Sequence, residues 1–175
     1  ALITSTSGNF VNNVGGSLQG TGSIAAAFFT NQGGSLSPGY SPGIQTFTSS
    51  ENFSNSLMHI EINGLSTAGV NFDQIVVSGT ATLGGTLNLA TNFTPDGGDY
   101  VVILTASQVT GTFSAFTGQT SAWDVVYSAT EVGLKAKDVT TWTGSVNTNW
   151  FTGGNWTVRV PSVKMDAIIP NVTND

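Results

Sequence analysis

The chain has 175 residues, which is enough for one domain with a substantial core plus part of a neighbour, and too few for two large independent domains. Charged residues make up 8% of the sequence, against roughly 25% in ordinary soluble proteins. The net charge of -6, with 4 Lys and Arg residues, leaves no basic stripe and argues against binding to nucleic acid or to an anionic membrane surface.

Cysteine is absent, so disulfides and thiolate metal sites are excluded, and this absence favours a bacterial source. The sequence contains no run of about 18 apolar residues, so we predict no direct insertion into a membrane. The chain begins at Ala1 rather than Met, and we expect a processed or excised piece whose export signal is gone.

Helix signals are scarce, and only residues 24–29 would tolerate a helix. Strand signals recur instead. Residues 58–62 alternate apolar with polar, which predicts that Met58, Ile60 and Ile62 are buried while His59 and Glu61 face water. The same period of two is found at 80–83, 86–89, 109–116 and 132–135. Denser apolar runs at 74–77, 100–104 and 123–127 are predicted to be strands covered on both faces.

A short repeat accompanies these strands. Gly-Gly-Ser-Leu occurs at 15–18 and 33–36, and Gly-Gly-Thr-Leu at 84–87. Short strands at such spacing predict an all-β fold, either a β-solenoid of stacked coils or a β-sandwich, since a period of two does not distinguish parallel from antiparallel pairing.

The stretch GGSLSPGYSPGIQTF at 33–47 is predicted to be a rigid corner. Gly34, Gly39 and Gly43 can supply positive φ, while Pro38 and Pro42 fix φ near -65°. Without a Cβ at the three glycines, neighbouring coils can approach closely.

GGSLSPGYSPG at 33–43 and FDQIVVSGTATLGGTLNLATNFTPDGGDYVVILTASQVTGTFSAF at 72–116 together resemble the β-helical passenger regions of bacterial autotransporter-like surface proteins. Those regions carry a Gly-Leu-Ser-Pro-Gly-Asn-Ser-Pro-Gly turn and then Asp-x-Leu-x-Val-x-Gly-x-Ala-x-Leu-Gly-Gly-x-Leu. The resemblance covers roughly residues 15–136, with Tyr40 where the pattern favours Asn. It implies a right-handed parallel β-helix.

The tail, TWTGSVNTNWFTGGNWTVRVPSVKMDAIIPN at 141–171, is similar to Trp-containing modules found in tandem in large secreted proteins of Bacteroidetes. The resemblance implies that Trp142, Trp150 and Trp156 form a structural cluster that opens a new set of β-coils. With a boundary at 138–141, we predict a β-helix domain at 1–138 and the start of a second, truncated β module at 139–175.

Motifs that carry chemistry are weak. Residues 39–43 match the G-x-S-x-G nucleophile elbow, but Pro42 has no N–H to donate to an oxyanion hole. His59 is the single histidine and has no motif partner, and Asp73 at a strand start fits turn chemistry. Asp96 and Asp99 suggest a plain Asp/Gly turn more strongly than a Ca²⁺ loop, which needs six or more oxygens. We therefore predict no catalytic, metal or cofactor-binding residue.

Aromatic rings are the better candidates for recognition, because a ring in water can stack on a sugar. The function predicted is that of a non-enzymatic structural protein, secreted or on the bacterial cell surface, serving as a stalk, adhesin or fibre segment that can pair with itself end to end. The alternative is a carbohydrate-binding module or a β-helical polysaccharide-active enzyme, with extracellular glycans as partners. The predicted ligand or assembly contacts are Tyr40, Trp123, Tyr127, Trp142, Trp150 and Trp156.

Overall fold

In the computed structural model the described part of the chain is residues 2–39 and 41–170, together with their side chains except those of 2–9, 27 and 28. The described residues form β-strands and one 3-10 turn, so the all-β prediction is confirmed. The elements are β1 (Leu2–Asn13), β2 (Ser17–Gln19), β3 (Gly22–Gln32), β4 (Ser35–Ser37), β5 (Ile44–Phe47), β6 (Glu51–Phe53), β7 (Leu57–Ile62), β8 (Gln74–Leu83), β9 (Thr86–Thr91), β10 (Tyr100–Thr110), β11 (Ala115–Gly118), β12 (Trp123–Tyr127), β13 (Glu131–Ala136), β14 (Val139–Thr141), the 3-10 turn η1 (Gly153–Asn155) and β15 (Asp166–Ile168).

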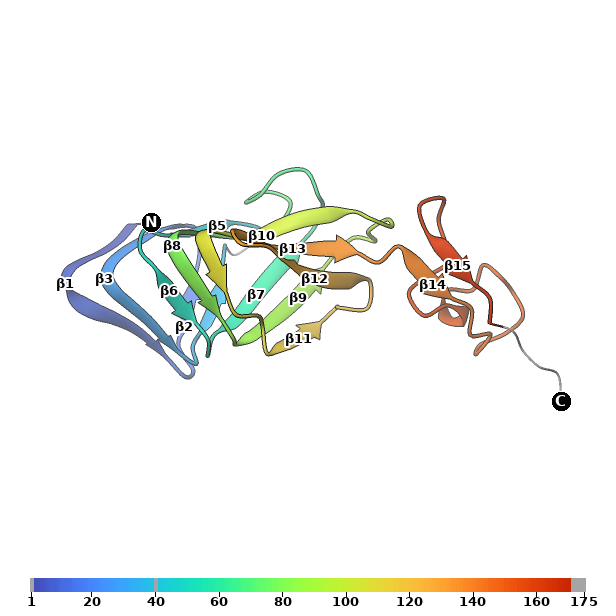
Figure 1. The fold of residues 1–175 in the computed structure, drawn as a ribbon, viewed down its shortest axis with the longest axis horizontal. Coiled ribbons are helices and arrows are strands. Elements are labelled where there is room, and N and C mark those ends of the chain that lie inside the picture. The colour runs from blue at the N-terminus through green and yellow to red at the C-terminus, as the bar shows by residue number, and fades with distance from the viewer. Residues whose placement is uncertain (1, 40, 171–175) are drawn as a thin grey trace.

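The described strands are arranged in three sheets. An eight-stranded sheet has the order β1-β3-β5-β8-β10-β13-β12, with β6 also paired to β8, and a five-stranded sheet has the order β11-β9-β7-β4-β2. The third sheet is β14 with β15, which lies beyond the end of β13 and far from the N terminus (Figure 1).

Pairing within the two large sheets is mostly parallel. Each neighbour pair from β1 to β10 in the first sheet, and every pair in the second, is parallel. The chain therefore crosses from one sheet to the other and returns beside its previous strand, because a tight hairpin would give antiparallel neighbours. The antiparallel set β10-β13-β12 interrupts this pattern.

Apolar side chains stack in columns between the sheets. Leu18 is paired with Leu36, Leu36 with Met58, Met58 with Leu87, and Leu87 with Phe116, one residue from each strand of the second sheet. Leu36, Met58 and Leu87 have no exposed surface, as the alternation at 58–62 predicts. Burying side chains of this size stabilises the fold by about 1.5–3 kcal/mol each.

The Gly-Gly repeat is explained by this column. Its three copies enter β2, β4 and β9 in the same way, and each ends on a leucine of the column. The irregular gap before the third copy holds another pass of the chain, in which Ser56-Leu57-Met58 takes the equivalent place.

The stretch at 33–47, predicted to be a corner, contains β4 and β5 with a turn between them, and its glycines are needed for two different reasons. Gly39 has positive φ (91°), as predicted, but Gly34 and Gly43 do not, and that part of the prediction is wrong. At those two positions a Cβ would come within 2.7 Å of the Asn12 Oδ1 atom and 2.6 Å of the Thr21 Cγ2 atom. Close approach between passes, rather than backbone conformation, therefore requires glycine there.

Replacing Gly85 by alanine is expected to lower the free energy of unfolding by about 1–3 kcal/mol, because the new Cβ would overlap the backbone of Ser56 in the preceding pass. Gly153→Ala is the matched control, since no heavy atom lies within 4 Å of a Cβ built there. Chemical denaturation of both variants measures the difference. Equal stabilities would contradict the close approach.

One expectation about individual strands needs correction. The runs at 74–77, 100–104 and 123–127 are not covered on both faces. Val76 and Val102 are half-buried, as is Gln74, and the exposed side chains are those of Tyr100, Asp124 and Val126. Residues 24–29, which would tolerate a helix, lie within β3 and are held there by pairing with β1 and β5. Among the described residues, no helix is long and apolar enough to cross a membrane.

Candidate functional site

A hollow with converging polar groups lies on the outer face of the five-stranded sheet. It has a volume of about 390 Å³ and is formed by β2, β4, β7 and β9 with the corner after β4 and the start of β8. We call it the polar hollow. Its polar side chains are Gln19, Ser37, His59, Glu61, Asp73 and Asn88.

Asp73 connects two passes of the chain at the hollow. Its two carboxyl oxygens accept N–H groups from Gly43 and from Glu61, each at 2.8 Å. The residue is 3% exposed, and burial raises the pKa of its carboxyl to about 7, against the lowering effect of the two backbone hydrogen bonds. The expectation of turn chemistry for Asp73 is wrong, because its oxygens accept from residues 30 and 12 positions away and hold the stretch after β4 to β7.

His59 belongs to a row of polar side chains that crosses the sheet. Its Nδ1 lies 3.2 Å from the Asn88 Oδ1 atom, and the Asn88 amide donates to Thr117 Oγ1 at 3.0 Å. Because an amide oxygen only accepts, Nδ1 is the donor in this hydrogen bond. His59 is half-buried rather than fully exposed to water. Gln19 and Ser37 are paired in register on the same outer side, and we call these five residues the outer row.

Glu61 lies one outward position beyond His59 on β7. Its Oε1 accepts from the side-chain amides of Asn63 at 2.9 Å and Asn92 at 3.3 Å. Like His59 it is half-buried, not freely exposed. The side-chain amides of Asn63 and Asn92 therefore hold the Glu61 carboxylate in place at the hollow.

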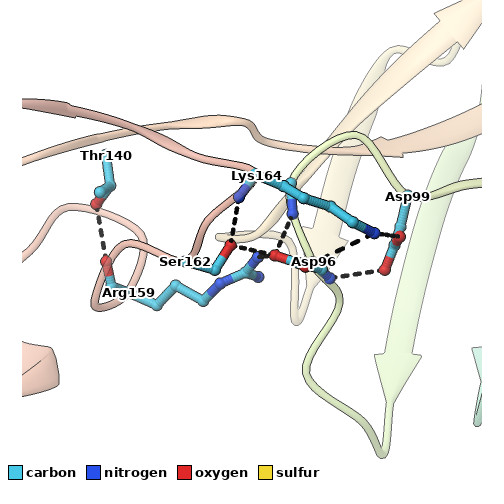
Figure 2. Close-up of polar contacts among 7 residues, drawn as sticks. Asp96, Asp99, Thr140, Arg159, Ser162 and Lys164 are labelled. Atoms are coloured by element: carbon cyan, nitrogen blue, oxygen red, sulfur yellow. Dashed lines mark hydrogen bonds and ion pairs between the residues drawn. The ribbon is translucent and has the colours of Figure 1, made fainter.

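The described residues contain no group of three His, Asp or Glu side chains placed to hold a metal ion. The Asp96 and Asp99 carboxylates instead meet cations from the tail. Arg159 Nη2 lies 3.3 Å from Asp96, and Lys164 Nζ lies 3.7 Å from both carboxylates (Figure 2). Ser162 also donates to Asp96, and this hydrogen bond is the main reason that the pKa of Asp96 is below its ordinary value. These ion pairs and this hydrogen bond join the turn after β9 to the Trp-containing tail.

Glu51 is a second buried acid, separate from the hollow. It is 3% exposed, its Oε1 accepts from Ser49 at 2.8 Å, and its Oε2 is buried without a hydrogen-bond partner. Burial raises the pKa of this carboxyl from 4.5 to about 7. Between these values the folded protein keeps a proton that the unfolded chain has lost, so this group's contribution to stability falls as the pH rises through that window.

We expect Glu51→Gln to raise the melting temperature at pH 8 by about 4 °C or more and to leave it nearly unchanged at pH 4, because the neutral amide has no charge to bury. Glu131→Gln is the control, since Glu131 is partly exposed and accepts from the Tyr100 hydroxyl at 3.1 Å. Thermal melts from pH 4 to 9 measure the melting temperatures of the parent protein and of both variants. The same change at both pH values would show that Glu51 is not protonated in the folded protein.

The aromatic candidates in the body of the molecule do not meet at one site. Trp123 is 1% exposed and packs edge-on against Phe93, with ring centroids 6.2 Å apart, so its ring is not available for stacking on a sugar. Tyr127 is half-buried, and its hydroxyl oxygen accepts the Phe113 N–H at 3.0 Å. Tyr40 lies outside the described residues.

The three tail tryptophans do come together, as their resemblance implies. Trp142 stacks on Trp150 at 5.7 Å between ring centroids, and Trp156 meets both rings edge-on, at 5.1 Å from Trp142 and 4.5 Å from Trp150. Trp156 Nε1 donates to the Trp150 carbonyl at 2.8 Å. Trp156 is 5% exposed and Trp150 is 41% exposed, so the cluster is a small core with one ring open to water.

Sequence reasoning missed the polar hollow as a site. His59, Glu61 and Asp73 were weighed singly and set aside, and Gln19, Ser37 and Asn88 carry no motif. The signal that could have found the hollow is the column alignment: once Leu18, Leu36, Met58 and Leu87 are aligned, the residue after each of them falls in the outer row.

Comparison with known proteins adds no relative. No protein-family model matches the chain, and no curated protein matches it significantly.

Proposed function

We propose that the body of this chain is a right-handed parallel β-helix that serves as a non-enzymatic rod segment, a stalk, adhesin or fibre, secreted or displayed on the outside of a bacterial cell. The parallel pairing from β1 to β10 and throughout the five-stranded sheet supports this reading over a β-sandwich, whose sheets are antiparallel.

The observation that carries the proposal is the continuous column of paired residues from Leu18 to Phe116. Each pass of the chain adds one layer to the same hydrogen-bond ladder and the same apolar core, so length increases by repetition of one unit. A rod of this kind transmits force and holds a binding surface away from a cell.

The resemblances of residues 15–136 to autotransporter-like passengers and of 141–171 to tandem secreted modules support an extracellular location. In the described structure β14 begins at Val139 and pairs with β15 instead of with the large sheets. The boundary predicted at 138–141 remains a prediction.

End-to-end association is the variant of this proposal that has a physical basis in open strand edges. In the described structure β1 and β2 each pair on one side only, which leaves backbone groups open to a further strand. At the other end β11 also pairs on one side only, whereas β12 pairs antiparallel with β13 and carries Asp124, 3.9 Å from Lys137. A charged antiparallel edge disfavours continuation of the parallel ladder in the first sheet.

Negative-stain electron microscopy at two protein concentrations tests the proposal. We expect separate short rods at both concentrations for a stalk or adhesin segment. Long filaments of uniform width that increase with concentration would support self-assembly. Compact round particles at both concentrations would contradict the rod.

A further inference from the structure

The polar hollow has no part in the rod proposal, and its charge restricts what it can bind. Glu61 and Asp73 line it, and the sequence contains no Lys or Arg before Lys135. An anionic ligand would therefore meet the Glu61 carboxylate with no Lys or Arg in the lining to offset its charge.

The groups of the hollow include both donors and acceptors of hydrogen bonds. The Gln19 amide and the Ser37 hydroxyl can donate and accept, and the Glu61 carboxylate keeps one oxygen beyond its bonds to Asn63 and Asn92. A ligand that satisfies both kinds of group must itself donate and accept hydrogen bonds. Hydroxyl groups of a sugar meet this need without the cost of burying a charge.

The outer row also suits an extended, chain-like ligand better than a compact one. Gln19, Ser37, His59, Asn88 and Thr117 come from five adjacent strands, β2, β4, β7, β9 and β11. Neighbouring strands are about 4.8 Å apart, so the row continues along the direction in which the passes stack. The hollow in its middle, at about 390 Å³, lies within the size range of small-molecule sites.

We propose that the polar hollow and the outer row bind a neutral glycan chain laid across β2, β4, β7 and β9, with the His59 and Asn88 side chains as its central contacts. The described residues lining the hollow include no Phe, Trp or Tyr, and the contacts proposed for the glycan are hydrogen bonds. We expect a weak dissociation constant, between about 0.1 and 10 mM.

The test uses the whole chain and its single histidine as a reporter. The His59 Cε1–H signal is followed by NMR during titration with cellohexaose, xylohexaose and mannohexaose as neutral chains, hexagalacturonate as an anionic chain and the chitosan hexamer as a cationic chain. We expect at least one neutral chain to shift the His59 signal in a saturable way, and hexagalacturonate to leave it unchanged.

Two variants test the location independently. His59→Leu and Asn88→Leu are each expected to weaken binding of the neutral chain by about 5-fold or more, since each removes a hydrogen-bonding group. Gln108→Leu is the matched control, because Gln108 is an exposed residue of β10 on the other sheet. It should bind as the parent chain does, and circular dichroism confirms that each variant is folded.

Three results would overturn the proposal. One is the absence of any shift with all neutral chains at about 20 mM. Another is binding of the chitosan hexamer alone, which would make the hollow a cation-attracting surface. The third is a neutral chain that binds without moving the His59 signal, which would place the site elsewhere. The His59 signal of the unaltered protein decides the outcome even if a variant fails to fold.

Discussion

Replacing Phe47 by alanine is expected to lower the free energy of unfolding by about 3–5 kcal/mol. Phe47 has no exposed surface and lies between Phe29 and Phe53, with ring centroids 5.2 and 5.4 Å away. Phe10 stacks on Phe29 at 5.6 Å, so the four rings form a column within the body of the molecule. Alanine at position 47 would leave a cavity in the middle of this column, and the surrounding rings are held by strand pairing and cannot fully close it.

Urea denaturation followed by far-UV circular dichroism measures this loss. Val70→Ala is the control, because Val70 is 67% exposed and its truncation should change the free energy of unfolding by less than about 0.5 kcal/mol. A loss below about 1 kcal/mol for Phe47→Ala would mean that the packing of the four phenylalanine rings contributes little to stability and that the two sheets are packed in another way.

Replacing Asn155 by alanine is expected to destabilise the tail by about 2–4 kcal/mol and to remove the near-UV circular dichroism of the tryptophan cluster. Asn155 is fully buried, and its Oδ1 accepts the N–H groups of Val146 and Asn147 at 2.8 and 3.1 Å. Its amide donates to the Asn147 side chain and to the Asn149 carbonyl, each at 2.9 Å. Alanine would leave these backbone groups without partners in the loop that holds Trp150.

Thr148→Ala is the matched control, because Thr148 is exposed within the same loop. The effect of replacing Asn155 by alanine should be confined to the near-UV spectrum and to tryptophan fluorescence, while the far-UV signal of the large sheets is retained. An unchanged near-UV spectrum would contradict the role of Asn155. Loss of the far-UV signal as well would show that the body depends on the tail for its folding.

The all-β class, the inward and outward faces of 58–62 and the tail tryptophan cluster could all be predicted from the sequence. Each depends on local physics or on a motif whose residues lie close together in the chain. Alternation decides a face because successive side chains point to opposite sides of a strand. Scarce helix formers and frequent glycine decide the class.

Contacts between passes could not be predicted in the same way, because the connections vary in length and a period of two does not state which strand is the neighbour. Only the tertiary structure brings Gln19, His59 and Asn88 to one hollow, and only it shows that a Cβ at Gly34 would meet Asn12 and one at Gly43 would meet Thr21. It also decided that Asp96 pairs with Arg159 from the tail, more than 60 residues along the chain. The sequence by itself determined the faces and the turns, while packing of distant passes determined the sites, since a site is made where separate strands place their side chains side by side.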